Sequence, residues 1–457
     1  MLMADNYRGD RLQRKLGLFS LTNIVIANMI GAGIFTTSGL IIGILENPLL
    51  MIFLWLGGGI IAISGALCYG ELGSAFPYAG GEYLYLSRLF HPVIGFLSGW
   101  VSFFVGFSAP IAASAIGFSE YLFRVFPELF KIGLFNENIE ILIFKKLISV
   151  SVILIFTFVH LRGIEFGAGV QNFLTLLKIC LILALLVAGF LSGNGSMENL
   201  ISTGNFKFDF SGFKSIGLAL MWIMFSYSGW NASSYIGSEI KKPSRNLSLS
   251  LILGTGIVLV LYLSLNLLYI YAIPSEKMKG VISIGGLTAK NLLGKTFESY
   301  FSLLIAFALF SSLSAFIILG PRVYYSMAKD GLFFNFASYV HPKFKVPSKS
   351  IILQSLIAII ILLTGTFEQI LTYMGFSLGI FPVLAVAGVF KLRKRNLSSY
   401  KIPGYPVIPV FYILTAVFIL IFGFLKSPIP STIAIFTVLA GIPAYFIFKR
   451  RKVNEKI

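Results

Sequence analysis

The sequence predicts an all-α polytopic membrane protein with about twelve transmembrane helices. Hydrophobic residues make up 57% of its 457 residues, and the mean hydropathy is +0.88. Charged residues make up 12%, whereas soluble domains average about 25%, so a water-soluble core would lack a solvating surface. The net charge of +18 lies in short clusters between long apolar runs, which favours a membrane protein over a nucleic-acid-binding protein. A soluble enzyme is thereby excluded.

The first half of the chain contains six predicted spans, because a bilayer-crossing helix needs about 20 mostly apolar residues. A basic cytoplasmic segment, 1–17, precedes the first apolar run. That run continues past Leu40, so it is a transmembrane helix and not a signal peptide. The predicted spans cover roughly residues 18–43, 49–73, 94–122, 146–161, 169–191 and 214–238.

The second half contains six further apolar runs of similar length. The longest gaps between spans in the whole chain, 74–93, 123–145 and 274–297, are too short for a second soluble domain. The remaining predicted spans cover roughly residues 247–273, 298–325, 350–366, 369–391, 406–425 and 429–448.

The distribution of Lys and Arg residues predicts the orientation in the membrane. With both termini in the cytoplasm, the cytoplasmic segments hold 24 basic residues and the outer segments hold 11. Cytoplasmic loops of membrane proteins carry such an excess. We therefore expect a multi-pass protein of the cell membrane with both termini inside. One basic residue, Lys178, remains within a span.

Two predicted spans contain glycine-rich interruptions near their middle. The first carries Asn28-Met29-Ile30-Gly31-Ala32-Gly33, and the sixth carries Phe225-Ser226-Tyr227-Ser228-Gly229-Trp230-Asn231. Small residues also serve close helix packing in membranes. However, the two interruptions occupy matching positions in halves of opposite orientation, which is the pattern of an inverted repeat with discontinuous helices.

Few ionisable residues lie at mid-membrane depth. All four aspartates fall outside the spans, Glu71, Glu120 and Glu239 lie at span ends, and Glu82 lies in a loop helix. Without a carboxylate pair the spans lack the parts for acid–base hydrolysis, so we predict no enzyme and no catalytic residue. The two cysteines lie in apolar runs, and no histidine has a second ligand at metal spacing, so neither a metal nor a cofactor is predicted.

Lys178 is the exception, since it lies about 13 Å along the fifth span from its cytoplasmic end. A lysine near a helix end can extend its amine to the membrane surface, but this depth makes that difficult. Its amine therefore needs carbonyl or hydroxyl partners, or it loses its proton.

The interrupted helices supply groups that suit an α-amino acid. Free N–H groups at Ala32 and Gly33 would face a carboxylate. Unpaired carbonyls at Met29, Phe225 and Ser228 would accept hydrogen bonds from an ammonium group. The spans offer neither an acidic nor an arginine partner for a charged side chain, so the pattern predicts a neutral amino acid as substrate.

An ordered series of motifs resembles the amino acid–polyamine–organocation superfamily of permeases, near its L-type amino-acid transporter branch. The resemblance covers nearly the whole chain. Its motifs are Gly31-Ala32-Gly33-Ile34-Phe35, Glu71-Leu72-Gly73, Pro77, Gly80-Gly81-Glu82-Tyr83, Gly229-Trp230-Asn231, Glu239 to Asn246, Arg322, Met327 to Gly331, His341-Pro342, Val346-Pro347 and Pro403-Gly404-Tyr405-Pro406.

The resemblance implies a LeuT-like fold with a five-plus-five inverted repeat and alternating access to a midplane site. The first repeat would comprise residues 18–191 and the second 214–391, with two additional spans in 406–448 and a basic tail, 449–457. The first and sixth spans would be discontinuous.

The same resemblance implies roles for individual residues. Gly31, Ala32 and Gly33 would hold the substrate carboxylate, and the carbonyls of Met29, Phe225 and Ser228 would hold its amine. The Phe225 ring would close over the substrate as a gate, with simple packing as the alternative. Asn231 would line the site.

Lys178 resembles a lysine that several relatives place where others bind sodium. Its amine would contact the interrupted first span and hydroxyls of the eighth, for which Ser311 and Ser312 are candidates. The resemblance thus implies sodium-independent transport, either by amino-acid exchange with a charged lysine or by proton symport through a lysine of lowered pKa.

The partners expected are a neutral amino acid and the lipid bilayer, with no nucleic acid. Animal relatives join a single-span glycoprotein through a cysteine between the third and fourth spans. Residues 123–145 contain no cysteine, so no disulfide-linked heavy subunit is expected. The alternatives are a transporter of cationic amino acids or polyamines, weakened by the missing acidic pocket residue, and a transporter-like amino-acid sensor. A channel lacks the ring of polar pore residues that it would need.

Overall fold

The computed structural model describes residues 12–126, 128, 137–201, 206–281, 284–364, 367–397 and 400–454. Within these ranges the chain is helical, and the only β-type pairs are isolated bridges from Leu16 to Ile240 and from Ala79 to Ile236. Part of the predicted cytoplasmic segment 1–17, part of the loop 123–145 and the end of the tail 449–457 lie outside the described residues.

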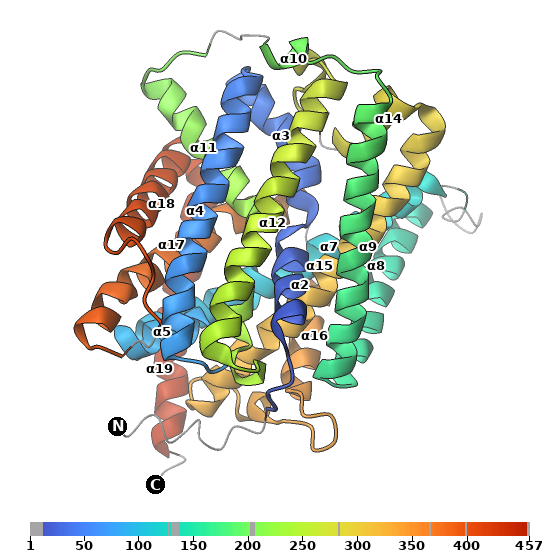
Figure 1. The fold of residues 1–457 in the computed structure, drawn as a ribbon. Helices are drawn as coiled ribbons and strands as arrows, with labels where there is room; N and C mark the ends of the chain where they lie inside the picture. The colour runs from blue at the N-terminus through green and yellow to red at the C-terminus, as the bar shows by residue number, and fades with distance from the viewer. Residues whose placement is uncertain are drawn as a thin grey trace.

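The first five predicted spans form helices with short connections, and the first is divided in two (Figure 1). Asn47 begins the helix of the second span, since its side chain accepts a hydrogen bond from the Leu50 N–H at 2.9 Å. The helices of this half are α2 (Leu18–Met29), α3 (Ala32–Leu45), α4 (Pro48–Ala75), α5 (Glu82–Leu89), α6 (Pro92–Val101), the π-helix η1 (Ser102–Ser108), α7 (Ala109–Val125), α8 (Glu137–Leu161) and α9 (Ile164–Leu191).

The second half begins with a helix capped by Asp209, whose carboxylate accepts a hydrogen bond from the Gly212 N–H at 2.7 Å. Its elements are α10 (Glu198–Ile201), α11 (Phe210–Ser226), the 3₁₀ turns η3 (Ala232–Tyr235) and η4 (Gly237–Glu239), α12 (Pro243–Ala272), α13 (Ser275–Met278), α14 (Ile284–Leu293), α15 (Lys295–Lys329), η5 (Asn335–Ser338), α16 (Ser348–Thr364), α17 (Phe367–Lys394), α18 (Val407–Lys426) and α19 (Pro428–Asn454).

Ten stretches of helix among the described residues are long and apolar enough to cross a membrane. Two shorter apolar helices, α11 and α16, have 17 residues each. They correspond to two of the twelve predicted spans. Large apolar side chains such as Phe173, Val260 and Leu414 remain exposed on the outside of the bundle, as contact with lipid requires. The chain is a multi-pass membrane protein.

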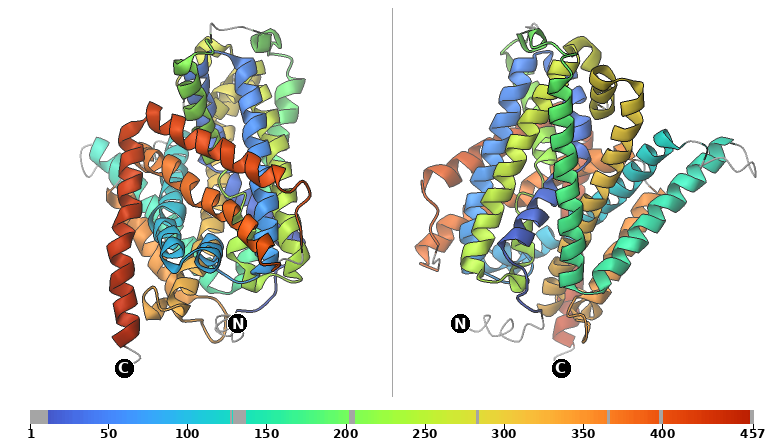
Figure 2. Two further views of the ribbon diagram at one scale, coloured as in Figure 1. Left: turned by 90° about the vertical axis from the view of Figure 1, so that its left-hand side faces the viewer. Right: turned by 45° about the vertical axis from the view of Figure 1, so that its right-hand side comes forward.

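The helices form one bundle in which α12 packs against α4 and α2, and α15 packs against α7 and α9. The first described residues and the C-terminal end of α19 lie at the same end of the bundle (Figure 1). In Figure 2, α18 runs obliquely across one side of the bundle beside the upright α19, and α8 leans away from α9 on another side. The interruption between α2 and α3 is enclosed by this arrangement.

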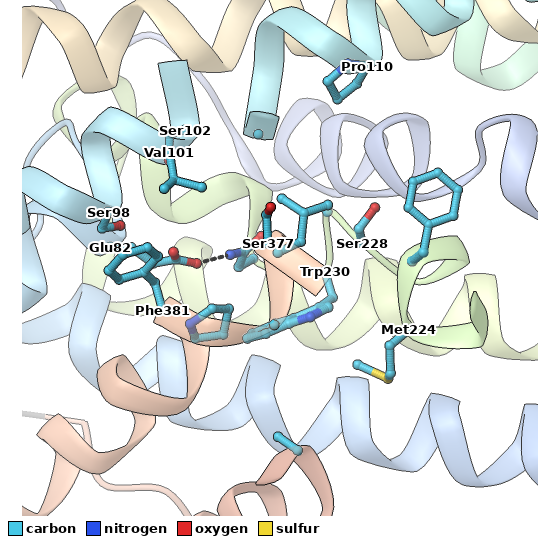
Figure 3. Close-up of a pocket in the computed structure, with 18 of the residues that line it drawn as sticks. Glu82, Ser98, Val101, Ser102, Pro110, Met224, Ser228, Trp230, Ser377 and Phe381 are labelled. Carbon is cyan, nitrogen blue, oxygen red and sulfur yellow. Dashed lines mark hydrogen bonds between the residues drawn. The ribbon is translucent and has the colours of Figure 1, made fainter. Parts of the chain in front are cut away.

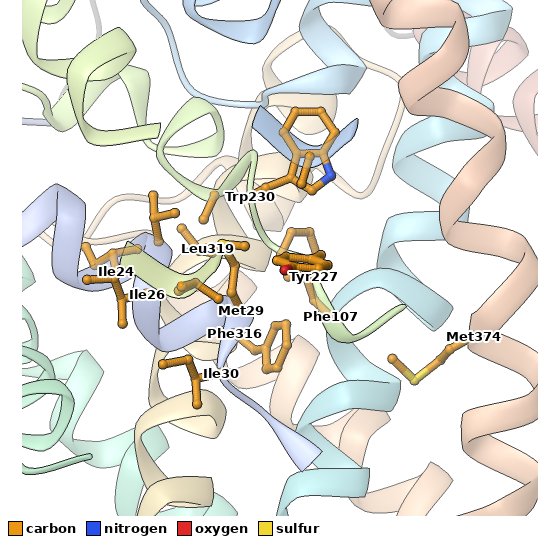
Figure 4. Close-up of a cluster of buried hydrophobic side chains, with 14 of the residues drawn as sticks. Ile24, Ile26, Met29, Ile30, Phe107, Tyr227, Trp230, Phe316, Leu319 and Met374 are labelled. Carbon is orange, nitrogen blue, oxygen red and sulfur yellow. The ribbon is translucent and has the colours of Figure 1, made fainter. Parts of the chain in front are cut away.

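Buried apolar and aromatic side chains surround the interruption. Met29 and Ile30 lie near Tyr227 and Phe316 in this cluster (Figure 4). The Trp55 ring lies 5.5 Å from that of Tyr262, edge to face. The core therefore packs directly against the segment expected to bind substrate.

Candidate functional site

The first span is interrupted at two residues in the middle of the bundle. The helix α2 ends at Met29, and α3 begins at Ala32. Between them Gly31 is extended, with φ −115° and ψ −153°. The Ile30 N–H still bonds to Ile26 O at 2.9 Å, as in a helix. The first N–H groups of α3 and the last carbonyls of α2 thus meet at this point.

The sixth predicted span also ends its α-helix midway. Ser226 is the last residue of α11, and the chain continues through a turn at Gly229 into η3 and η4 without resuming an α-helix. Gly229 has a φ of +98°, and an added Cβ would lie 2.9 Å from the carbonyl carbon of Asn28. Only glycine permits both this conformation and this close approach to the first span.

A single tyrosine joins the two helix ends. The Tyr262 hydroxyl, from α12, lies 2.7 Å from Met29 O and 2.9 Å from Ser226 O. Met29 O also accepts a hydrogen bond from the Gly31 N–H at 2.9 Å. The ends of α2 and α11 are therefore held against a common, fully buried side chain.

Gly33 allows α3 to contact α11. An added Cβ would lie 2.8 Å from the Ser226 Cα, closer than the backbone can accommodate without a shift. We expect Gly33→Ala to destabilise the protein by about 1–3 kcal/mol, as overpacking of a close contact does. Gly57→Ala is the matched control, because nothing lies within 4 Å of its added Cβ. Thermal unfolding in detergent measures both, and equal melting temperatures would contradict this account of the contact.

Lys178 extends from α9 to the interruption of the first span and is 1% exposed. Its amine donates to the Ile30 carbonyl, to Ala27 O at 3.4 Å and to Ser312 Oγ at 3.0 Å. No ion pair of Lys178 occurs within the described ranges. The ammonium is thus held by the carbonyl end of α2 and one hydroxyl of α15.

The two serines proposed as partners of Lys178 differ in their contacts. Ser312 Oγ contacts the lysine and also lies 2.7 Å from Ile30 O. Ser311 Oγ instead lies 3.0 Å from the Gln171 side-chain nitrogen and 3.3 Å from Thr175 Oγ1. Ser311 therefore supports the neighbouring turn of α9 and makes no hydrogen bond to the lysine amine.

A pocket lies beside the two interruptions (Figure 3). Of the predicted site residues, Phe225, Ser228 and Asn231 line it. Met29, Gly31 and Gly33 are not among its lining residues, whereas Asn28, the residue before Met29, is. The side chain of Ala32 lies outside the described residues. The rest of the wall comes from the turn at Gly229 and from α4, α5, α6, η1, α7, α11, η3, α15, α17 and α18. The π-helix η1 contributes Ser102, Gly106 and Phe107, and such π-turns often occur at functional sites.

The pocket also contains a carboxylate, which corrects the expectation that it has no acidic residue. Glu82, 6% exposed, lines the pocket from the start of α5. Its Oε1 accepts hydrogen bonds from Asn231 Nδ2 at 2.6 Å and from the Tyr235 hydroxyl at 3.2 Å. The sequence assigns Glu82 to a loop between spans, and only the tertiary fold brings this loop against η3. The Asn231 side chain that lines the pocket is therefore hydrogen-bonded to the Glu82 carboxylate.

Asn28 is a second pocket residue that sequence reasoning did not single out. It is 4% exposed, and its side-chain nitrogen has no hydrogen-bond partner among the described residues. An unpaired buried donor of this kind is uncommon. A signal for it existed in the sequence, since Asn28 is a polar residue at mid-span depth within the glycine-rich segment.

Contacts near the N-terminus hold the first and sixth segments together. The N–H groups of Lys15 and Leu16 both lie 2.9 Å from Glu239 O. The Glu239 carboxylate is held by two hydrogen bonds of 2.8 Å from Arg322 of α15, and both side chains are almost completely buried. Separating η4 from α15 requires breaking a buried, bidentate ion pair.

Comparisons with known proteins agree with this architecture. A family model described as amino acid permease matches residues 16–445. The serine/threonine exchanger SteT of Bacillus subtilis is 27% identical over 97% of this chain and 98% of its own. The Asc-type amino acid transporter 1 of Mus musculus is 26% identical over 95% of this chain and 81% of its own.

A third relative is the large neutral amino acids transporter small subunit 2 of Mus musculus, 26% identical over 96% of this chain and 82% of its own. All three are amino-acid transporters of the L-type branch, as the motif resemblance predicts. The matched family consists of membrane transporters rather than enzymes, and its model covers nearly the whole chain. This chain therefore belongs to the amino acid permease family.

Proposed function

We propose that this protein is a sodium-independent secondary transporter that moves neutral L-amino acids across the cell membrane by alternating access. It works as an exchanger or as a proton-coupled symporter. The observation that carries the proposal is the position of Lys178, whose amine contacts Ile30 O, Ala27 O and Ser312 Oγ at the first interruption. A resident ammonium at the carbonyl end of a helix takes the place that a sodium ion would occupy.

The proposed architecture has twelve spans, with discontinuous first and sixth spans in a LeuT-like five-plus-five inverted repeat. The repeats comprise residues 18–191 and 214–391, followed by the spans in 406–448 and the tail 449–457. The end of α2 at Met29 and of α11 at Ser226 supports this proposal. So does the common end of the bundle at which the first described residues and the end of α19 lie (Figure 1). We place that end in the cytoplasm because of its excess of basic residues.

The proposed substrate site uses the main chain at the interruptions. The N–H groups of Ala32 and Gly33 face the carboxylate, joined by that of Gly31 once it gives up its hydrogen bond to Met29 O. The carbonyls of Met29, Phe225 and Ser228 face the amine. Met29 O and Phe225 O already accept one or two hydrogen bonds, so the amine must share or displace these. Phe225 lines the pocket, which supports its proposed role as the gate, and Asn231 contacts the substrate beside it.

The printed names of the relatives support neutral substrates, since they include a serine/threonine exchanger and a large neutral amino acids transporter. No disulfide-linked heavy subunit is proposed, because residues 123–145 contain no cysteine. Neither a metal nor a cofactor is part of the proposed mechanism.

Purified protein in liposomes tests the proposal. Counterflow of labelled serine and leucine should proceed equally in sodium and in choline buffer, and a panel of the twenty amino acids should compete mainly through its neutral members. Strict sodium dependence would refute the role of Lys178, and an absence of counterflow with every amino acid would refute the proposed function.

A second candidate function is transport of cationic amino acids or polyamines. One observation favours it, namely the buried carboxylate of Glu82 in the pocket wall. A substrate ammonium or guanidinium group would be a suitable partner for that carboxylate. Competition by lysine, arginine or putrescine in the same panel distinguishes this candidate from neutral transport.

A further inference from the structure

Glu82 is a buried acid at the substrate pocket that the proposed transport mechanism does not use. Both of its hydrogen bonds, from Asn231 and Tyr235, end on Oε1, and no donor among the described residues bonds to Oε2. Two buried hydroxyls, those of Tyr69 and Ser98, face the carboxyl without making a hydrogen bond of good geometry. The carboxyl therefore has capacity for one more group at Oε2.

The charged side chains of the surrounding helices are engaged elsewhere. On α15, Arg322 is bonded to Glu239, and on α17, Arg393 lies 2.7 Å from Glu71. On α5 itself, Arg88 lies 4.0 Å from Asp330. The helix α6 carries no charged residue, and the other groups that interact electrostatically with Glu82 are the phenols Tyr69, Tyr85, Tyr235 and Tyr412. No cation among the described residues compensates the charge of Glu82.

The neighbours of Glu82 accommodate both of its protonation states. A tyrosine or serine hydroxyl rotates to donate to a carboxylate or to accept from a carboxyl group. Burial raises the pKa of Glu82, and the polar side chains around its carboxyl group, those of Tyr69, Tyr235, Asn231 and Ser98, oppose but do not cancel this effect. The acid therefore takes up a proton at a higher pH than an exposed glutamate does.

The loop that carries Glu82 is joined to the second interruption. Ala79 pairs with Ile236, and its N–H bonds to Ser238 Oγ at 2.9 Å. Gly81 has a φ of +50°, and an added Cβ would lie 2.4 Å from the Tyr235 ring. The hydrogen bonds from Asn231 and Tyr235 thus join the start of α5 to η3 and the turn before it, and they break when these segments separate.

We propose that Glu82 is the proton-binding group of this transporter. It takes a proton at Oε2 from the pocket and releases it on the cytoplasmic side when η3 separates from α5. This inference rests on the proposed function and deepens it, since it names the residue that makes amino-acid movement depend on pH. A proton fits better than a substrate cation, because the carbonyls at the interruptions already serve the substrate amine and a neutral side chain leaves the carboxylate uncompensated.

Proteoliposomes with the membrane potential clamped by potassium and valinomycin test the proposal. An inward gradient of one pH unit can support about tenfold accumulation of a neutral amino acid if one proton moves with each molecule. We expect wild type to accumulate labelled serine and to acidify trapped pyranine. Glu82→Gln should lose both responses, and its counterflow should become independent of pH. Glu82→Asp, which keeps a carboxyl group, should retain gradient-driven uptake with a shifted pH dependence.

Glu165→Gln is the matched control, because Glu165 is 65% exposed and pairs with Lys15 outside the pocket. It should behave as wild type. Gradient-driven uptake that survives in Glu82→Gln would overturn the proposal. Lys178 would then be the candidate for the proton-binding group. Wild-type counterflow without a gradient response would also overturn it, while leaving the proposed function intact. Loss of lysine or putrescine transport alone in Glu82→Gln would instead make Glu82 a partner of the substrate's charge. Failure of wild-type counterflow with all amino acids would refute the proposed function itself.

Discussion

Replacing Lys178 with alanine is expected to reduce amino-acid counterflow by about a hundredfold or more. The substitution removes hydrogen bonds from an ammonium group to Ile30 O and Ser312 Oγ. Each hydrogen bond to a charged group contributes about 1.5–3 kcal/mol, and about 1.4 kcal/mol corresponds to a factor of ten. The end of α2 then loses the cation that holds it to α15. Initial rates of labelled serine counterflow, normalised to the amount of folded protein in the liposomes, measure the effect.

The two neighbouring serines provide an internal comparison for this prediction. Ser312→Ala removes a direct partner of the lysine amine and should lower counterflow. Ser311→Ala removes only contacts to Gln171 and Thr175, so its loss should be smaller. Lys214→Ala, at the start of α11 and remote from the interruption, should transport as wild type. Counterflow at the wild-type rate in Lys178→Ala would remove the basis of the proposed ion substitution.

Arg322→Met is expected to destabilise the protein by about 3–5 kcal/mol, because it leaves Glu239 buried without its partner. Arg322 and Glu239 are 1% and 0% exposed, and two hydrogen bonds of 2.8 Å join them. The same change should loosen the contact of Lys15 and Leu16 with Glu239 O. Thermal unfolding in detergent measures the loss of stability.

The double variant Arg322→Met/Glu239→Gln should recover part of that stability, since no unpaired charge remains buried. As a matched control, Lys15→Met breaks an exposed ion pair with Glu165, whose members are 37% and 65% exposed. Such pairs contribute about 0–1 kcal/mol, so the melting temperature should hardly change. Equal effects of Arg322→Met and Lys15→Met would show that burial does not govern the strength of the Arg322 pair.

Much of the fold could be predicted from the sequence because hydropathy acts along the chain. The predicted span 49–73 corresponds to α4, and 247–273 corresponds to α12. Gly31 and Gly229, which belong to the two glycine-rich segments of the sequence, follow the ends of α2 and α11. The apolar runs 214–238 and 350–366 predict the helices α11 and α16. Each of these helices has 17 residues, fewer than the about 20 that a membrane-crossing helix usually has.

The sequence by itself determined that this protein lies in a membrane, that it belongs among amino-acid permeases, and that Lys178 is a buried charge in need of partners. The tertiary structure decided which partners it has. Ser311 and Ser312 are indistinguishable in a hydropathy profile, and the rotation of α15 brings Ser312 to the lysine. Likewise, Glu82 lies outside every span, and the packing of α5 against η3 brings it to Asn231 across 149 residues. Contacts between helices far apart in sequence depend on how each helix is rotated and tilted in the bundle. A hydropathy profile along the chain does not show this rotation and tilt.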